Sequence, residues 1–519
     1  MKRYLIASLF ILFATSSNAD EKGECGSGLT YVYEESTKTL TISKTGEGSG
    51  QMNDYYITNT KSASIAPWLS IKGGIQTLIV ELGVTSIGEY AFYFSDISVV
   101  SLPESLVSIG YGAFMDCWKI TSLTLPNSLT FVDGYAFSGC EALTSMEIPE
   151  SVTFIGKGLF STCFNLQLVK LPSAIKSIED HTFYACHNLL TVAIPNNVTT
   201  IKSYAFQDCG NLKSINIPSE ITSIGQNAFE GCSGLERVNI LDIGSWCKID
   251  FEDYGNPLYY AKHLFVNDEE INNLVIPDEI TEIKRRAFNG FDAMKTLTLG
   301  SNIKSIEEYA FAFCNSLEKL VIPSSVVGIG KYAFTECSDL SEVELLGSME
   351  TIEFSTFENC SSLKSIRIHE GVKEIKTYAF TGCKNLKEVY LPSSVRTIYS
   401  CAFERCKNLK DVYCYATTRP IQELWTKKDV YEMFLNSNTE NSTLHVPEGS
   451  IDLYREAFPW MFFGTIVALT DNETSIETTR DDNKSYSYYT LDGKKARTPN
   501  KGIYIFKQND RKTKKVIIR

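Results

Sequence analysis

The apolar positions of this 519-residue chain recur with a period of 23 residues. The unit at 143–163, LTSMEIPESVTFIGKGLFSTC, has an alternating strand, a proline, a second short apolar piece and a turn ending in Phe-x-x-Cys. In most units the strand reads L-x-x-I-x-I before the proline, as at Leu212, Ile215, Ile217 and Pro218. In such a strand, alternate side chains point to opposite faces, and the proline ends ladder pairing and turns the chain. The phenylalanine of this unit recurs at Phe92, Phe114, Phe137, Phe160, Phe183, Phe206, Phe229, Phe288, Phe311, Phe334, Phe357, Phe380 and Phe403.

The spacing of these phenylalanines predicts the fold. The first spacing is 22, every later one within two blocks is 23, and the blocks are separated by 59. A fixed period in this range, with one short leucine-rich strand per unit, indicates a leucine-rich-repeat solenoid. We therefore expect one elongated, curved stack of about fourteen or fifteen coils, each touching only its neighbours, with a parallel β-sheet on the concave face.

The solenoid is expected to span residues 75–414, with one irregular coil at 233–287. Its strand pattern resumes from Ile271 to Pro277 in register with Phe288, so the stack should continue through this segment. A local hairpin is expected at 264–268. Insertions in repeat proteins often carry binding function, but we favour an enlarged structural coil.

The segments outside the array differ in character. Residues 20–74 contain an alternating hairpin pattern and predict an N-terminal β cap. Residues 415–470 predict a C-terminal cap, with strands at 443–447 and 465–469 and a short helix from Ser450 to Phe458. Residues 471–485 are polar and aperiodic and predict a linker. Residues 486–519 form a basic tail of strand–turn–strand character.

Residues 1–19 predict a secretory signal peptide, with a basic start, a short apolar run and small residues at Ser17 and Ala19. The apolar run is too short to span a bilayer, and no second one follows, so no membrane span is expected. Loss of Lys2 and Arg3 with this leader takes the formal net charge from −13 to −15. That charge disfavours nucleic acid as a partner.

All fifteen cysteines follow the leader. Equivalent positions of stacked coils lie about 4.8 Å apart, whereas a disulfide needs Cβ atoms about 3.5–4.5 Å apart with specific torsions. We predict a buried, reduced ladder of small apolar side chains, with partial bridging as the alternative. Eleven cysteines lie three residues after a repeat phenylalanine: Cys117, Cys140, Cys163, Cys186, Cys209, Cys232, Cys314, Cys337, Cys360, Cys383 and Cys406.

No catalytic constellation is present in the sequence. The chain has no H-E-x-x-H, no G-x-S-x-G and no C-x-x-C motif. We expect no enzyme activity, no catalytic residue, no cofactor and no metal site. A binding or adhesion protein is favoured, and a passive spacer of the cell envelope is the alternative. The five histidines are isolated from one another: His181, His187, His263, His369 and His445.

One column of outward strand positions distinguishes the two functions. A passive spacer should present bland polar residues there, whereas the C-terminal end of this column gathers Arg367, Tyr390 and Tyr413. Arg and Tyr are enriched at interface hot spots, so these three are the candidate binding residues. The alternative is the ordinary preference of Tyr for strands. The column reads Ser101, Thr124, Glu147, Lys170, Ala193, Asn216, Asn239, Thr298, Val321, Glu344, Arg367, Tyr390 and Tyr413.

The pattern L-x-x-I-x-I-P-x-x-V-x-x-I-G-x-x-A-F-x-x-C over residues 75–414 resembles the BspA-like leucine-rich repeats of surface proteins from Bacteroidota, spirochaetes and trichomonads. The resemblance implies a secreted or cell-surface adhesion protein, with another surface protein or host extracellular matrix as the partner. The tail YTLDGKKARTPNKGIYIF…KKVIIR is similar to C-terminal sorting segments of the type IX secretion route in Bacteroidota. An extra strand pair docked on the last coil is the other interpretation of this tail.

Overall fold

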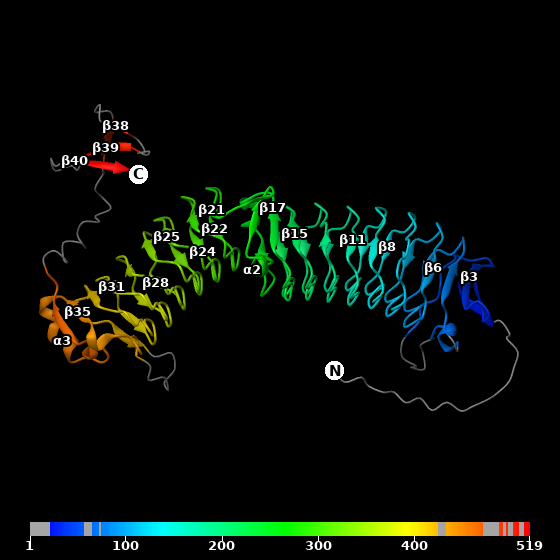
Figure 1. Ribbon diagram of the computed structural model, residues 1–519, viewed down its shortest axis with the longest axis horizontal. Coiled ribbons are helices and arrows are strands. Elements are labelled where there is room, and N and C mark those ends of the chain that lie inside the picture. The colour runs from blue at the N-terminus through cyan, green and yellow to red at the C-terminus, as the bar shows by residue number, and fades with distance from the viewer. Residues whose placement is uncertain are drawn as a thin grey trace.

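The computed structural model describes residues 21–56, 65–71, 74–423 and 432–470, together with the strands within 487–518. The predicted signal peptide and linker lie outside the described residues. The chain forms an elongated, curved stack of coils (Figure 1). The predicted repeat solenoid is confirmed, with coils of about 23 residues and parallel sheets. It has about 17 turns rather than fourteen or fifteen, because the irregular segment and the caps add turns of their own.

The L-x-x-I-x-I piece of each unit forms the first ladder of parallel strands. Its register pairs residues 23 apart in the regular blocks, as in Val169 with Val192 and Val389 with Val412. The ladder is interrupted at 121–126, where no strand forms, and between β13 and β15, β19 and β21, and β27 and β29. Its strands are β3 (Thr39–Lys44), β4 (Thr77–Val80), β6 (Val99–Ser101), β9 (Ser145–Glu147), β11 (Leu168–Lys170), β13 (Thr191–Val192), β15 (Ser214–Ile217), β17 (Arg237–Ile240), β19 (Leu264–Val266), β21 (Asn273–Val275), β23 (Thr296–Thr298), β25 (Lys319–Ile322), β27 (Glu342–Leu345), β29 (Ser365–Arg367), β31 (Glu388–Leu391), β33 (Asp411–Cys414), β35 (Thr443–Val446) and β36 (Thr465–Ala468).

The second apolar piece of each unit forms a narrower ladder, so the expected parallel sheet is accompanied by another. Its strands are mostly two residues long, which leaves one inward apolar residue per coil, such as Ile155 or Ile178. The strands are β5 (Ser86–Ile87), β7 (Ser108–Ile109), β8 (Phe131–Val132), β10 (Phe154–Ile155), β12 (Ser177–Ile178), β14 (Thr200–Ile201), β16 (Ser223–Ile224), β18 (Asp250–Phe251), β22 (Glu282–Ile283), β24 (Ser305–Ile306), β26 (Gly328–Ile329), β28 (Thr351–Ile352), β30 (Glu374–Ile375), β32 (Thr397–Tyr399) and β34 (Ile421–Glu423).

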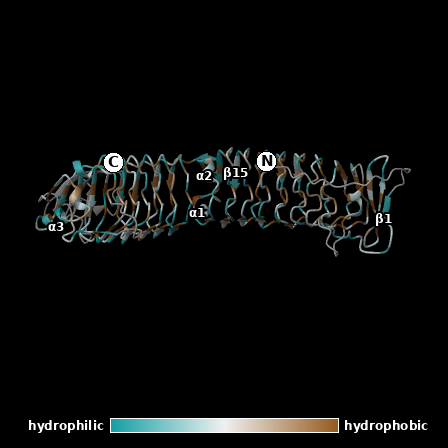
Figure 2. Cartoon of the chain, turned by 90° about the horizontal axis from the view of Figure 1, so that it is seen from below, coloured by the Kyte–Doolittle hydropathy of each residue, from teal (hydrophilic) through white to brown (hydrophobic). Residues whose placement is uncertain are grey.

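The core between the ladders is one continuous cluster of buried apolar side chains, and hydrophobic segments recur from coil to coil along the stack (Figure 2). Within each block the repeat phenylalanines stack face to face, with ring centroids 5.0–6.1 Å apart. Such aromatic pairs add about 0.5–1.5 kcal/mol beyond their burial. The rings therefore link each coil to both neighbours.

The cysteine column lies beside these rings, and its predicted burial is confirmed. Each of the eleven thiols donates to the carbonyl of the phenylalanine in the preceding coil, over 3.1–3.5 Å. S–H donors make weak bonds, and in most coils the accepting carbonyl also accepts a backbone N–H from three residues later, as Phe137 O does from Cys140 N at 3.3 Å. The fifteen cysteines are unbridged in the structure, while their redox state in solution stays a prediction.

The turn around each repeat phenylalanine depends on left-handed backbone. In all thirteen coils the residues two before and two after the phenylalanine have φ between 51° and 80°. Non-glycine residues pay about 1–2 kcal/mol for this conformation, and most of these positions are not glycine. At Gly158 a side chain would also clash, since a Cβ would lie 2.3 Å from the Tyr135 ring of the preceding coil. Contacts between coils must therefore hold these turns in place.

Two tryptophans begin the two blocks. In the regular stack, the N–H of each repeat phenylalanine donates to the carbonyl of the residue that precedes the next repeat phenylalanine, as Phe92 N does to Ala113 O. In the first coil of each block, this carbonyl has no preceding phenylalanine to donate to it. The Trp68 indole N–H donates to Ala91 O at 2.7 Å, and the Trp246 indole N–H donates to Ala287 O at 2.8 Å. The irregular segment thus closes one block and starts the next.

The irregular segment forms two short helices, α1 (Ile243–Trp246) and α2 (Leu258–Ala261), in place of the regular turns. The expected hairpin is confirmed: β19 pairs antiparallel with β20 (Glu269–Glu270) through Asn267 and Asp268, both left-handed. Helix α1 starts at Asp242, whose carboxylate accepts from Ser245 N at 2.7 Å. The stack continues through the segment, as expected.

The two ends of the solenoid are covered by additional structure. The expected N-terminal hairpin is β2 (Leu29–Glu34) with β3, extended by β1 (Glu21–Gly26), and β3 pairs parallel with β4 to join the first ladder. At the other end, Ser450 is the N-cap of α3 (Ile451–Arg455), which ends before Phe458. The Ser450 hydroxyl donates to Thr417 O rather than capping the helix. Four 3-10 turns complete the ends: η1 (Pro67–Ser70), η2 (Thr439–Asn441), η3 (Glu448–Ser450) and η4 (Trp460–Phe462).

The tail forms a four-stranded antiparallel sheet rather than a strand pair. The order is β38-β37-β39-β40. The strands are β37 (Ser487–Thr490), β38 (Lys495–Ala496), β39 (Gly502–Lys507) and β40 (Thr513–Ile518).

Candidate functional site

The three predicted binding residues lie side by side on adjacent strands of the first ladder. Arg367 on β29 is in register with Tyr390 on β31, and Tyr390 with Tyr413 on β33. The guanidinium of Arg367 lies 3.8 Å from the centre of the Tyr390 ring. The rings of Tyr390 and Tyr413 stack with centroids 4.6 Å apart and planes 5° apart. A cation over an aromatic face contributes about 0.5–2 kcal/mol, so the three side chains form one ordered surface.

His445 on β35 extends this surface and was missed by the sequence analysis. It is in register with Tyr413, and the two rings stack at 4.3 Å. Its Nε2 lies 3.1 Å from an Asp411 carboxylate oxygen. The available signal was the apolar–polar–apolar order of residues 444–446, which carries the outward column into the cap. We call Arg367, Tyr390, Tyr413 and His445 the aromatic row.

Acidic side chains lie beside the aromatic row. The Tyr390 hydroxyl donates to the Glu388 carboxylate at 3.0 Å. Burial raises the pKa of Tyr390, and the hydrogen bond and negative charge of Glu388 raise it further. Tyr390 is therefore a neutral phenol at physiological pH. Glu388 and Asp411 thus place two carboxylates beside the row, where they can meet basic groups on a partner.

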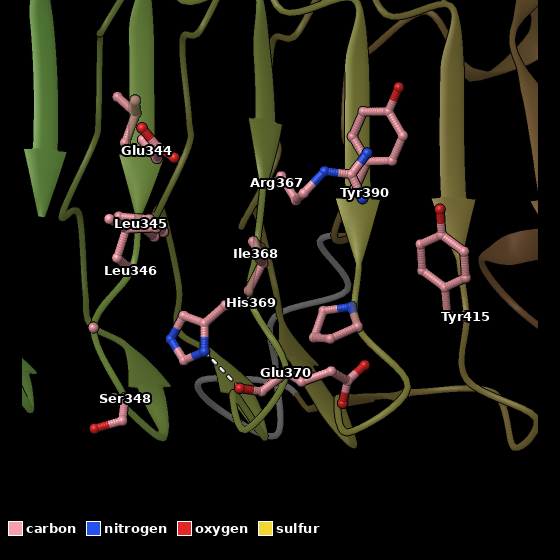
Figure 3. Close-up of a pocket in the computed structure, with 13 residues that line it drawn as sticks. Glu344, Leu345, Leu346, Ser348, Arg367, Ile368, His369, Glu370, Tyr390 and Tyr415 are labelled. Carbon is pink, nitrogen blue, oxygen red and sulfur yellow. Dashed lines mark hydrogen bonds between the residues drawn. The ribbon is translucent and has the colours of Figure 1, made fainter. Parts of the chain in front are cut away.

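A hollow of about 460 Å³ opens at the end of the row (Figure 3). Most units have a proline directly after the first-ladder strand, but Leu346 and His369 occupy that position in these two coils. The floor is apolar and includes the buried side chains of Ile368, Pro392 and Tyr415. A pocket of this size with apolar walls and a few polar groups is typical of a ligand site.

The rim of the hollow is polar. Arg367 contributes to it from the aromatic row, and Glu344 and Glu370 contribute carboxylates. Glu370 is held in place, since Ser393 donates to it through its N–H at 2.6 Å and its hydroxyl at 3.2 Å. The Nε2 atom of His369 is buried and has no hydrogen-bond partner in the described part of the chain. The aromatic row and the hollow together form a surface that can accept an apolar side chain flanked by charged groups.

The same outward column has a different character in the first block. Lys170 pairs with Glu147 at 2.6 Å, and Asn239 donates to Asn216 at 2.7 Å. Exposed ion pairs of this kind contribute about 0–1 kcal/mol. Polar groups there bond to each other, whereas the second block presents aromatic faces.

Within the described residues, no group of three or more His, Cys, Asp or Glu side chains is placed to hold a metal ion. None of the helices in this part of the chain has the length and apolar character to cross a bilayer.

Comparison with known proteins gives the family. The family described as BspA type leucine rich repeat region matches in six copies, over residues 72–189, 155–247, 260–385 and 329–461. A leucine-rich repeat protein from Bacteroides ovatus is 24% identical, with 77% of this chain and 98% of that chain covered and a TM-score of 0.45. A search of curated proteins finds no match.

Two more solved structures are similar at comparable levels. A leucine-rich repeat protein from Eubacterium ventriosum is 21% identical, with 81% and 95% of the two chains covered and a TM-score of 0.35. A leucine rich cell surface protein from Faecalibacterium prausnitzii is 24% identical, with 80% and 97% covered and a TM-score of 0.32. The family match spans more than half of the chain and carries the assignment. The chain belongs to the BspA type leucine-rich-repeat family.

Proposed function

We propose that this protein is a non-enzymatic binding protein that recognises a protein ligand through the aromatic row and the adjoining hollow. The main support for this proposal is the stacking of Arg367, Tyr390 and Tyr413 on one face of the sheet. Large aromatic and Arg side chains that lose little freedom on binding are the usual anchors of an interface. The stacking already restricts these side chains, so less conformational entropy remains to be lost on binding.

The chemistry of the site favours a partner with an apolar anchor and basic groups. The apolar floor of the hollow, including Ile368 and Pro392, fits an aliphatic or aromatic side chain. The carboxylates of Glu388 and Asp411 beside the row favour Lys or Arg on the same partner. The acidic net charge of the chain acts in the same direction at longer range.

The proposed setting is the bacterial cell surface or the extracellular medium, and the partner is another surface protein or a host matrix protein. The family and the predicted leader at 1–19 support export. The tail at 486–519 is proposed as an address for passage across the outer membrane. A passive envelope spacer is the competing function, and it predicts that no surface of the second block contributes to binding.

The experiment compares two triple variants of the full chain. Arg367→Ala, Tyr390→Ala and Tyr413→Ala together remove the anchors. The immobilised wild-type protein is exposed to host matrix proteins and to bacterial surface extracts, and captured proteins are then titrated individually. Truncation of a hot-spot residue costs about 2 kcal/mol or more, so affinity should fall at least about 30-fold.

The matched control lies in the same column of the first block. Lys170→Ala, Asn216→Ala and Asn239→Ala together should leave the affinity unchanged. Thermal unfolding is measured for both variants, because unchanged transitions separate lost contacts from lost folding. An anchor variant that binds as tightly as the wild type, or a control variant that loses as much affinity, contradicts the proposed site.

A further inference from the structure

The irregular segment meets the second block near α2 (Figure 1), and a second hollow lies at this junction. Its volume is about 230 Å³. It forms because α2 replaces the regular turn and packs directly on the following coil. Gly290, with φ of 80°, permits this approach, since a Cβ there would lie 2.7 Å from the Tyr259 Cα. The lining residues are Tyr254, Asn256, Tyr259, Arg286, Asn289, Tyr309 and Phe313.

Aromatic side chains make most of the wall. The Tyr259 ring meets Phe313 edge to face at 5.9 Å. Tyr309 stacks on Tyr332 of the next coil at 4.5 Å, which fixes its ring. Tyr254 is 55% exposed and stands at the mouth. The Tyr309 ring is also in contact with the Arg286 guanidinium, and Lys262 Nζ lies 4.4 Å from the centre of the Tyr259 ring. The exposed Tyr254 is therefore the ring most open to a ligand.

The polar groups of the hollow are not all satisfied. Asn289 is only 5% exposed, and its Oδ1 acceptor has no partner among the described residues. The Nε donor of Arg286 is also buried without a partner in the same part of the chain. An unpaired buried polar atom is destabilising, so each such group calls for a specific explanation.

The neighbouring Asn256 is different, because its amide bonds are complete. It donates to Arg286 O at 2.6 Å and to Ala287 O at 3.1 Å, and it accepts from Leu258 N at 2.8 Å. Asn256 therefore fastens α2 to the turn. Asn289 and Arg286, which carry the unpaired acceptor and the unpaired donor, both line the hollow.

The charge of the hollow is countered locally. Arg286 lies 3.0 Å from the Asp253 carboxylate, which also pairs with Arg285. Its guanidinium is stacked 4.5 Å from the centre of the Tyr309 ring. Arg286 is already paired with Asp253, so a ligand can bind beside it without carrying a negative charge, provided that it donates and accepts hydrogen bonds.

We propose that this junction hollow binds a single neutral pyranose ring, as a terminal residue of a glycan. A sugar hydroxyl donates to Asn289 Oδ1 and accepts from Arg286 Nε, so one functional group answers both unpaired atoms. The C–H groups of the sugar ring pack against the exposed Tyr254. The volume is below the range of about 300–1,000 Å³ usual for drug-sized ligands, which restricts the ligand to a small one. This site is separate from the aromatic row.

The test uses the full chain and four probes: methyl β-D-glucopyranoside, methyl β-D-galactopyranoside, methyl α-D-mannopyranoside and N-acetylglucosamine. Saturation-transfer NMR at millimolar sugar should detect binding of at least one, with the ring protons most strongly saturated. Titration calorimetry then compares variants. Asn289→Leu keeps the approximate volume and removes the acceptor, and Tyr254→Ala removes exposed wall. Each should weaken binding about tenfold, as expected for one lost hydrogen bond or contact.

The matched control is Tyr204→Ala, which alters the equivalent turn position in the first block, where Tyr204 stacks on His181 at 4.8 Å. It should bind sugar as the wild type does. Three results overturn the proposal: no probe gives saturation transfer, the control weakens binding as much as Tyr254→Ala, or a blocked dipeptide, N-acetyl-alanine methylamide, binds in place of every sugar. Asn289 is buried, so Asn289→Leu can lower stability as well as binding. Tyr254 is exposed, so Tyr254→Ala should leave the fold intact and still test the site.

Discussion

Replacing the two block-starting tryptophans by phenylalanine tests how the solenoid begins a stack. Trp68 and Trp246 are each 1% exposed, so Trp→Phe removes the same atoms from equally buried sites. Both changes remove an indole donor. The Ala91 carbonyl then has no remaining donor among the described residues. The Ala287 carbonyl keeps the bond from Asn256 Nδ2 at 3.1 Å.

The magnitudes follow from this difference. Lost burial contributes a similar penalty of about 1 kcal/mol at both sites. An orphaned buried carbonyl costs about 1–3 kcal/mol, whereas losing one of two bonds costs about 0.5–1.5 kcal/mol. Trp68→Phe should therefore lower the local unfolding free energy by about 1 kcal/mol more than Trp246→Phe.

Hydrogen exchange with mass spectrometry is the suitable assay, because long repeat arrays open locally and need not unfold in one step. The amides of residues 86–95 report on Trp68→Phe and those of 282–291 on Trp246→Phe, each compared with the wild type. Equal penalties, or a larger one for Trp246→Phe, would refute the role assigned to the indole N–H groups.

Four further predictions follow from the core and the tail. Native protein should resist a thiol reagent, and denatured non-reduced protein should show most of its fifteen thiols free; five or more disulfides would contradict this. Burial raises the pKa of Cys117 and Cys163 from 9.0 to about 12. The unfolded chain therefore ionises first, and thermal melts should show stability that is full below about pH 8.5 and falls as the pH rises towards 12; replacing both by Ala should make the fall shallower, while other buried thiols with raised pKa values, such as Cys140 and Cys186, still contribute to it. Phe334→Ala, which opens a gap between two stacked rings, should cost about 3–5 kcal/mol by denaturant unfolding; a cost below 1 kcal/mol would be inconsistent with the stack. Deletion of 486–519 should strand folded protein in the periplasm, as read by cell fractionation, and normal surface amounts would rule out the sorting role.

The sequence by itself determined the repeat, the ladder and the contents of the core. A strand alternates with period two, so the L-x-x-I-x-I pieces already show which residues face inward. The 23-residue period places equivalent residues of successive coils next to each other, which was sufficient to predict the buried cysteine column and the row of Arg367, Tyr390 and Tyr413. These predictions need only the alternation of apolar and polar residues along the chain and the 23-residue period.

Only the tertiary structure decided the features that depend on broken periodicity. His445 joins the aromatic row although 32 residues, not 23, separate it from Tyr413. Trp246 reaches the carbonyl of Ala287, 41 residues away, and the junction hollow follows from how α2 packs on the next coil. Where the chain departs from its period, no fixed offset relates a residue to its neighbours. The contacts then depend on how the irregular backbone packs, and packing is a property of the folded molecule alone.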